Sequence, residues 1–67
     1  MSDVETVKAE VKKASARALR AKMDLHDLSE ELPVGLENVM AVAERVCSAY
    51  AALDEKKARL KALEKAA

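Results

Sequence analysis

The stretch MDLHDLSEELPVG, Met23 to Gly35, contains the only histidine, the only proline and the only glycine of this 67-residue chain. Pro33 disfavours helical geometry in the residue before it, and Gly35 permits backbone dihedral angles that other residues resist. The sequence on either side is rich in alanine, leucine and charged residues, a composition typical of long helices. The stretch therefore predicts a turn at residues 32–35 between two helices.

The segment before the turn contains an apolar repeat whose steps alternate between three and four residues. It consists of Val4, Val7, Val11, Ala14, Ala18, Ala21, Leu25, Leu28 and Leu32. This spacing is typical of a coiled-coil seam, the apolar stripe along which two helices pack. Ser2 and Glu5 fit a capping box at the start of the segment. A helix is therefore predicted over about residues 2–31.

The segment after the turn has a similar repeat, and it predicts a second helix over about residues 36–65. The repeat consists of Leu36, Val39, Ala43, Val46, Tyr50, Leu53, Lys57 and Leu60. Val42, Ala49 and Leu63 widen this stripe. Since Lys57 interrupts the apolar series, we expect looser packing far from the turn.

Two helices of similar length joined by a short turn predict an all-α fold, an antiparallel two-helix hairpin of the coiled-coil type. The hairpin would form a single domain over residues 1–67. Pairing residues at equal distances from the turn places Ala18 opposite Tyr50, and Ala21 opposite Val46 and Cys47. We therefore expect Tyr50 to fill the space beside small side chains and Cys47 to be buried.

Both helices carry further apolar or weakly polar side chains outside the seam. They are Ala9, Ala16, Leu19, Met23 and His26 in the first helix, and Met40 and Cys47 in the second. A lone hairpin cannot enclose these residues in a core. We therefore expect the free chain to be a homo-oligomer, pairing into a four-helix bundle, or to pack on a partner.

Charge is unevenly distributed, although the formal net charge is zero. Residues 1–23 carry a formal charge of +3, residues 24–44 of −6 and residues 45–67 of +3. A hairpin would therefore be acidic at its turn and basic at its open end. Two hairpins packed in opposite directions would place unlike charges together, so an antiparallel homodimer is predicted.

Several classes of function are disfavoured by composition. One glycine leaves no phosphate-binding loop, and a hairpin offers no concave pocket for catalysis. We therefore expect no enzyme and no cofactor. No apolar run approaches the length that spans a bilayer, and the first residues do not resemble a signal peptide. The single cysteine is typical of a reducing compartment, and a cytoplasmic location is expected.

His26 is the side chain best suited to a special role. Glu30 follows it by one helical turn, and Asp27 lies one step around the helix. These three residues are candidate metal ligands, but a metal site needs three or four converging ligands, and the chain has no paired histidines or cysteines. No metal site is therefore predicted. A surface histidine in an ion pair or partner contact is the simpler interpretation.

The basic residues of the first helix raise the alternative of RNA binding by a helical bundle. Proteins that bind RNA usually add aromatic side chains for stacking on bases. The only aromatic residue here is Tyr50, and the net charge is zero. Nucleic acid is therefore not the expected partner, and a solvated helix face accounts for these charges.

Two segments of the sequence look familiar. KMDLHDLSEELP, Lys22 to Pro33, and AERVCSAYAALDEKKARLKALE, Ala43 to Glu64, resemble the nitrogenase-associated factor T family of Rop-like small helical-hairpin proteins encoded in nitrogen-fixation gene clusters. The resemblance covers nearly the whole chain. It implies a hairpin without catalytic activity that acts in nitrogen fixation, through association with the nitrogenase molybdenum–iron protein or with factors of cofactor assembly and repair.

Our leading hypothesis is therefore that this chain is an accessory protein that docks on a nitrogenase component. The component can be in an active form or in an inactive or cofactor-deficient form when it is bound. The expected partner-binding residues are Leu19, Met23, His26, Asp27, Glu30 and Glu31. Two alternatives remain open. One is a carrier of a metal or an iron–sulfur cluster that uses His26 and the nearby acids, and the other is a Rop-like RNA-binding bundle.

Overall fold

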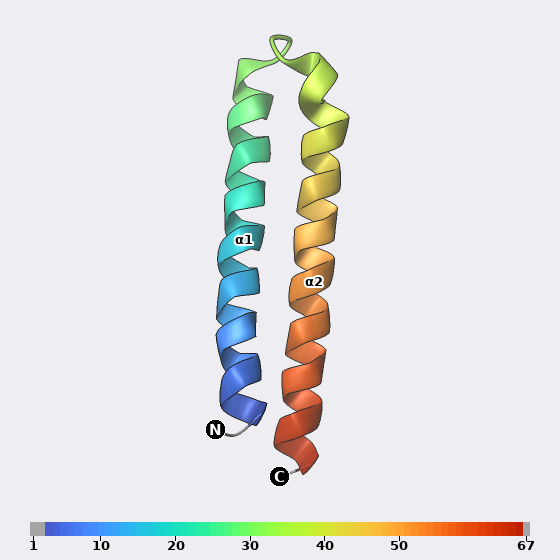
Figure 1. Cartoon of the computed structure of the whole chain (residues 1–67). Helices are drawn as coiled ribbons and strands as arrows, with labels where there is room; N and C mark the ends of the chain where they lie inside the picture. Colours follow the sequence, from blue (N-terminus) through green and yellow to red (C-terminus); the bar gives the residue numbers. More distant parts are fainter. Residues whose placement is uncertain (1–2, 67) are drawn as a thin grey trace.

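Two long helices lie side by side in opposite directions in the computed structural model, which describes residues 3–66 (Figure 1). Helix α1 spans Asp3–Glu31 and helix α2 spans Val39–Ala66. A short 3-10 helix, η1, covers Leu36–Asn38 and leads into α2. No strand occurs among the described residues. The predicted all-α antiparallel two-helix hairpin is confirmed.

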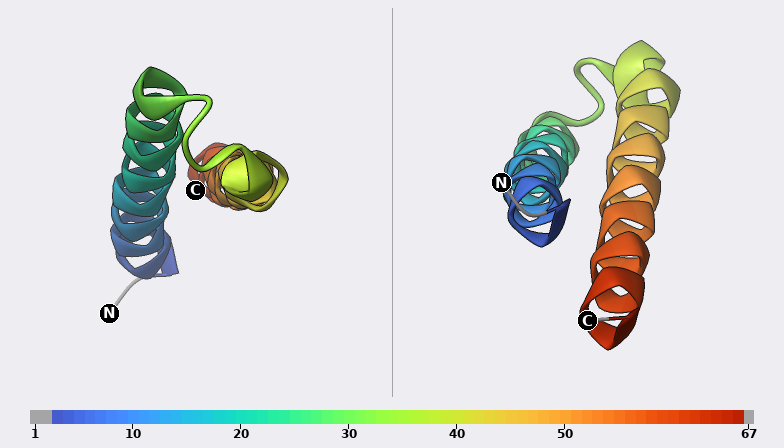
Figure 2. Two further views of the ribbon diagram at one scale, coloured as in Figure 1. Left: turned by 90° about the horizontal axis from the view of Figure 1, so that it is seen from above. Right: turned by 60° about the horizontal axis from the view of Figure 1, so that its bottom comes forward.

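The hairpin is a narrow rod with dimensions of 51 × 14 × 13 Å. The turn lies at one extremity, and the beginning of α1 and the end of α2 lie together at the other (Figure 1). Figure 2 shows that the helix axes are inclined to each other rather than strictly parallel, as in coiled-coil packing. Below, the tip means residues 32–40, and the open end is the extremity at which Asp3 and Ala66 lie.

Helix α1 ends at the predicted position. Glu31 is its last residue, and the Leu32–Pro33 peptide bond, which is cis, follows directly. Gly35 adopts a left-handed conformation with φ of 81°. A Cβ atom at this glycine would lie 2.9 Å from Cδ1 of Leu28, which is closer than side-chain atoms normally approach. The backbone conformation therefore favours glycine, and a larger residue would also require the Leu28 side chain to shift.

Three backbone hydrogen bonds hold the tip in shape. They link the amides of Val34, Leu36 and Asn38 to the carbonyl oxygens of Glu31, Pro33 and Gly35, at 3.0, 3.2 and 2.9 Å respectively. The second helix thus begins near the predicted position, but its first residues are 3-10 helical and α-helical geometry starts at Val39. The predicted capping box at the start of α1 depends on Ser2, which lies outside the described residues.

The seam of α1 follows the predicted repeat. Val7, Ala14 and Ala18 are buried, and every other predicted member except the last is half-buried. The exception is Leu32, which is exposed because it already belongs to the turn and no longer faces α2. The four-heptad pattern therefore placed this face of α1 correctly.

The seam of α2 differs from the predicted one. Its buried and half-buried members recur with steps of three and four, but they include the residues that were expected only to widen the stripe. They are Val39, Val42, Val46, Ala49, Leu53, Lys56, Leu60 and Leu63. Leu36, Tyr50 and Lys57 are exposed, so the prediction was wrong for these three residues. Ala43 remains half-buried at the edge.

The centre of the hairpin packs small side chains against a leucine. Ala14, Ala18 and Leu53 form the buried cluster, and Val11 and Ala49 pack against it. Ala18 therefore meets Leu53 and Ala49 in this cluster rather than Tyr50, which corrects the predicted pairing. Because alanines on both helices let their backbones approach closely, a tyrosine does not fit between them here.

Lys56 is the lysine at the seam, in place of the predicted Lys57. Its Nζ atom donates a hydrogen bond to Oε2 of Glu10 across the two helices at 3.1 Å. Both side chains are about one-third exposed, so water still solvates the pair. The pairing allows a charged residue at this position because its aliphatic stem covers the seam while its ammonium group reaches a carboxylate. This contact connects the helices in the half of the hairpin nearer the open end.

Candidate partner-binding surface

Two large apolar side chains are exposed on α1 outside the seam. Leu19 is 57% exposed and Met23 is 48% exposed. They are four residues apart, so they lie one above the other on the same helix face. His26 and Glu30 continue this line toward the tip, and both are exposed. We call this set of four residues the outer face of α1, and all four were among the residues expected to bind a partner.

His26 and Glu30 form an ion pair on the outer face. The distance between Nε2 of His26 and Oε1 of Glu30 is 2.6 Å, and both side chains are more than half exposed. The hydroxyl of Ser29 donates a hydrogen bond to the carbonyl oxygen of His26 at 2.7 Å. The imidazole is therefore held beside its carboxylate by a contact within one helical turn, in agreement with the predicted surface ion pair.

Asp27 and Glu31 are exposed beside the outer face. Each lies about 100° around the helix from its predecessor, so neither shares the line of His26 and Glu30. Within residues 3–66, no group of three or more histidine, cysteine, aspartate or glutamate side chains converges as a metal site would require. The candidate ligands His26, Asp27 and Glu30 are thus only partly brought together.

Cys47 is exposed, contrary to the expectation of burial. The reason is the changed seam of α2. Val46 faces α1, and a step of one residue turns the next side chain about 100° away. Cys47 therefore does not meet Ala21, which is half-buried on α1.

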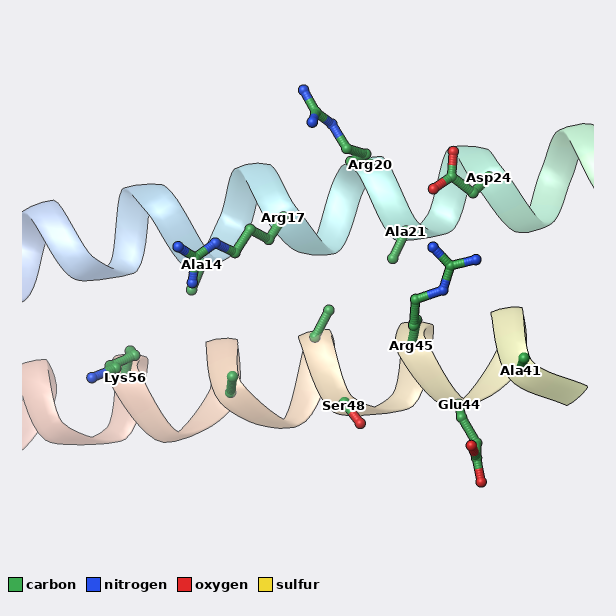
Figure 3. Close-up of a pocket in the computed structure, with 12 residues that line it drawn as sticks. Ala14, Arg17, Arg20, Ala21, Asp24, Ala41, Glu44, Arg45, Ser48 and Lys56 are labelled. Atoms are coloured by element: carbon green, nitrogen blue, oxygen red, sulfur yellow. The ribbon is translucent and has the colours of Figure 1, made fainter.

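A shallow groove with a volume of about 620 Å³ runs along one side of the hairpin. Its small residues are Ala14, Ala21, Ala41, Ser48, Ala49 and Ala52. Charged residues form its borders, namely Arg17, Arg20, Asp24, Glu44, Arg45 and Lys56. Figure 3 shows that Arg45 extends from α2 toward α1, near Ala21 and Asp24, whereas Arg20 and Glu44 point away from the groove. The sequence analysis missed this groove, because it forms only when small residues of both helices lie on one side of the hairpin.

The tip exposes further apolar side chains that the sequence analysis did not group together. Val34, Leu36 and Met40 are 71%, 61% and 77% exposed, and Leu32 is exposed as well. Leu36 had been predicted on the seam and Met40 on a second face of α2. Val34 could have been recognised, because a valine between Pro33 and Gly35 in a tight turn has no neighbour that could cover it.

A family model described as Rop-like matches residues 2–65. The chain belongs to the Rop-like family. The match spans nearly the whole chain, including both helices and the tip. No solved structure matches significantly. Among residues 3–66, the Rop-like chain has no helix with the length and apolar character needed to cross a membrane.

Curated relatives of this Rop-like chain carry the family designation UPF0437. The protein from Azorhizobium caulinodans is 47% identical over 64 residues, which are 96% of this chain and 93% of the relative. The y4xE protein of Sinorhizobium fredii is 45% identical over 64 residues, with 96% of each chain covered. A relative from Frankia alni, named for the nifX–nifW intergenic region, is 43% identical over 49 residues, or 73% of this chain and 60% of its own length.

Proposed function

We propose that this chain is a non-enzymatic accessory protein of nitrogen fixation that acts in the cytoplasm. Its partner is the molybdenum–iron protein of nitrogenase, which it binds also when that protein is inactive or lacks its cofactor. A factor of cofactor assembly and repair is the alternative partner. The observation that carries the proposal is the exposed apolar pair Leu19 and Met23 beside the His26–Glu30 ion pair. The position of the Frankia alni relative between nifX and nifW supports the nitrogen-fixation context.

The outer face of α1 has the composition of a small docking surface. Fully burying one leucine or methionine side chain stabilises a complex by roughly 1.5–3 kcal/mol, and about half of each side chain is available here. Asp27 and Glu31 lie at the edge, where charges guide encounter and orientation more than they add affinity. The arrangement therefore suits a reversible complex rather than a permanent one.

A non-enzymatic role agrees with the shape of the described residues. Two packed helices form a rod with a shallow groove, whereas enzymes bind substrates in deep, concave pockets that exclude water. The proposal therefore assigns no catalytic residue. It assigns binding to the outer face of α1 and to its acidic neighbours.

The two alternatives receive less support from the geometry. A metal or cluster carrier needs more ligands than the His26–Glu30 pair, and the described residues do not bring a third one to it. An RNA-binding bundle needs a basic surface. The groove instead mixes basic borders with Asp24 and Glu44, and its lining contains no aromatic side chain for stacking.

We also propose that the free chain pairs with a second copy across the groove. Its alanines would let two hairpins approach as closely as helices do in bundles. Residues 24–44, toward the tip, carry a formal charge of −6, and the segments toward the open end are each +3. An antiparallel arrangement therefore brings the acids of one copy to the bases of the other.

The binding proposal is tested with a double variant, Leu19→Ser with Met23→Ser, titrated against purified molybdenum–iron protein by calorimetry. Loss of the apolar contact is expected to weaken binding by about tenfold or more, which corresponds to about 1.4 kcal/mol. Helical content, measured by circular dichroism, should stay unchanged because both residues are exposed.

The matched control is Tyr50→Ser, which removes an exposed apolar side chain from the middle of α2. It should bind within about twofold of the unmodified chain, since contacts outside an interface contribute little. The proposal is wrong if the unmodified chain does not bind. If the double variant binds as tightly as Tyr50→Ser, the outer face of α1 is not the docking surface.

A further inference from the structure

Four of the large exposed apolar side chains gather at one extremity of the molecule. Leu32, Val34, Leu36 and Met40 all lie in the tip, and Met40 and Val34 are the most exposed of them. All four side chains are exposed, and the segment that carries them forms the turn and the first residues of α2 at one extremity of the hairpin (Figure 1). Exposed apolar patches bordered by polar residues mark interaction sites in soluble proteins.

The tip is held in one conformation. Its three backbone hydrogen bonds are 2.9–3.2 Å long, and Leu28 is half-buried beneath Gly35. A segment that is already ordered loses little conformational entropy when it binds. Val34 and Leu36 therefore project from a rigid support rather than from a flexible loop.

Acidic residues surround this apolar patch. They are Asp27, Glu30, Glu31, Glu37 and Glu44, all exposed, and no lysine or arginine occurs in residues 24–44. Within the part of the chain that the structure describes, only Glu30 among these acids has an ion-pair partner, His26. The side of the molecule that carries the apolar patch is therefore strongly negative and largely unpaired.

Two of these acids occupy an unfavourable place in their own helix. Glu30 and Glu31 lie in the last turn of α1, which contains no basic residue. The last turn is the negative end of the helix dipole, where a carboxylate is unfavourable. Among the described residues His26 pairs with Glu30, whereas no cation pairs with Glu31, and a local rule that is broken without compensation is typical of functional sites. A cation from another molecule would compensate this cost.

We propose that the tip is a docking element that inserts Val34 and Leu36 into an apolar hollow bordered by lysine and arginine side chains on a folded protein. The inference rests on the proposed function and specifies which part of the chain enters the partner. The outer face of α1 then lies along the wall of the hollow. The surrounding acids would repel nucleic acid and anionic lipid, so neither is the occupant.

The apolar part of the inference is tested with Val34→Ser combined with Leu36→Ser, against the molybdenum–iron protein in its complete and cofactor-deficient forms. Because both side chains are exposed, the fold should tolerate the changes. The double variant is expected to bind about tenfold or more weakly than the unmodified chain. Tyr50→Ser serves again as the control and should bind within about twofold.

The charge part uses a reversal, Glu31→Lys with Glu37→Lys. Its matched control, Glu55→Lys with Glu64→Lys, makes the same change in charge near the open end. Only the tip reversal is expected to weaken binding and to flatten its dependence on salt, because screening acts on the charges that meet the partner. A thiol-to-amine cross-linker on Val34→Cys, in a Cys47→Ser background, should then join the tip to partner lysines.

The outcomes separate this inference from the proposed function. If the unmodified chain binds neither form of the molybdenum–iron protein, both fail. If the Leu19 and Met23 variant loses binding but both tip variants bind like their controls, the proposed function stands and the inference is overturned. Cross-linking of the tip to lysines that do not border an apolar hollow would also overturn it.

Discussion

Gly35 shows how strongly one residue can determine a hairpin. Its left-handed backbone, with φ of 81°, turns the chain, and its missing side chain leaves room for Leu28. The amide of Asn38 donates a hydrogen bond to the carbonyl oxygen of Gly35. Sequence reasoning identified this residue because glycine is the usual solution to such a conformation.

Replacing Gly35 with alanine should therefore destabilise the hairpin. The left-handed conformation alone disfavours a Cβ atom by about 1–2 kcal/mol, and the close approach of Leu28 adds to this. Urea unfolding monitored by circular dichroism measures the change. Val34→Ala, at the neighbouring exposed position, should alter the free energy of unfolding by less than about 0.5 kcal/mol. Equal stability of Gly35→Ala and the unmodified chain would contradict this account of the turn.

Single residues were predicted well where a local rule governs them. The His26–Glu30 ion pair follows from a spacing of four within one helix, and the end of α1 follows from Pro33. Burial of Cys47 and Tyr50 was predicted wrongly, because it depends on how α2 is rotated toward α1. That rotation is a property of the packed pair and not of either residue.

At the scale of elements, α2 contains two overlapping apolar repeats. Both include Val39, Val46, Leu53 and Leu60. The predicted repeat adds Tyr50 and Lys57, whereas the observed one adds Ala49 and Lys56. Periodicity alone cannot choose between them, because both have steps of three and four. The partner helix decides, since the alanines of α1 favour the close approach that Ala49 permits and Glu10 accepts a hydrogen bond from Lys56.

The observed seam of α2 is tested by comparing two alanine variants. Leu53→Ala should lower the free energy of unfolding by about 2–5 kcal/mol, because it empties the buried cluster with Ala14 and Ala18. Tyr50→Ala should lower it by less than Leu53→Ala does, because Tyr50 is 36% exposed whereas Leu53 is 6% exposed. Thermal and urea unfolding at a fixed protein concentration provide both values. If Tyr50→Ala lowered the free energy of unfolding more than Leu53→Ala did, the seam predicted from the sequence would be correct and the observed one wrong.

At the scale of the whole molecule, the hairpin fold can be predicted from the turn residues and the apolar repeats. The groove and the exposed apolar residues of the tip cannot. The hairpin, its helix bounds and the seam of α1 were predictable. The groove was not, because it arises only when alanines from both helices are brought to one side. The apolar tip was not either, since Leu36 was assigned to the wrong face. The composition shows that the chain has more apolar side chains than two helices can bury, but it does not show where on the surface they lie.

The separation of charge along the 51 Å rod leads to a prediction for the free chain. In an antiparallel dimer, spin labels on Val34→Cys, in a Cys47→Ser background, should lie about 5 nm apart, because the two tips occupy opposite ends. Double electron–electron resonance measures this distance. Labels closer than about 2 nm would indicate parallel packing, in which helix axes lie 8–10 Å apart and like charges meet.

Both helices reach the same extremity, and this shared position has a mechanical consequence. A load applied between Asp3 and Ala66 would peel α1 from α2 one layer of side chains at a time, beginning with seam residues near the open end, such as Val7 and Leu63, and finishing at Gly35. Because each layer would bear the tension alone, the two helices should separate layer by layer at a low applied force. Tension between either end and the turn would instead strain all layers together. The direction in which an unfolding enzyme pulls on the chain would therefore determine how much force is needed to unfold this protein.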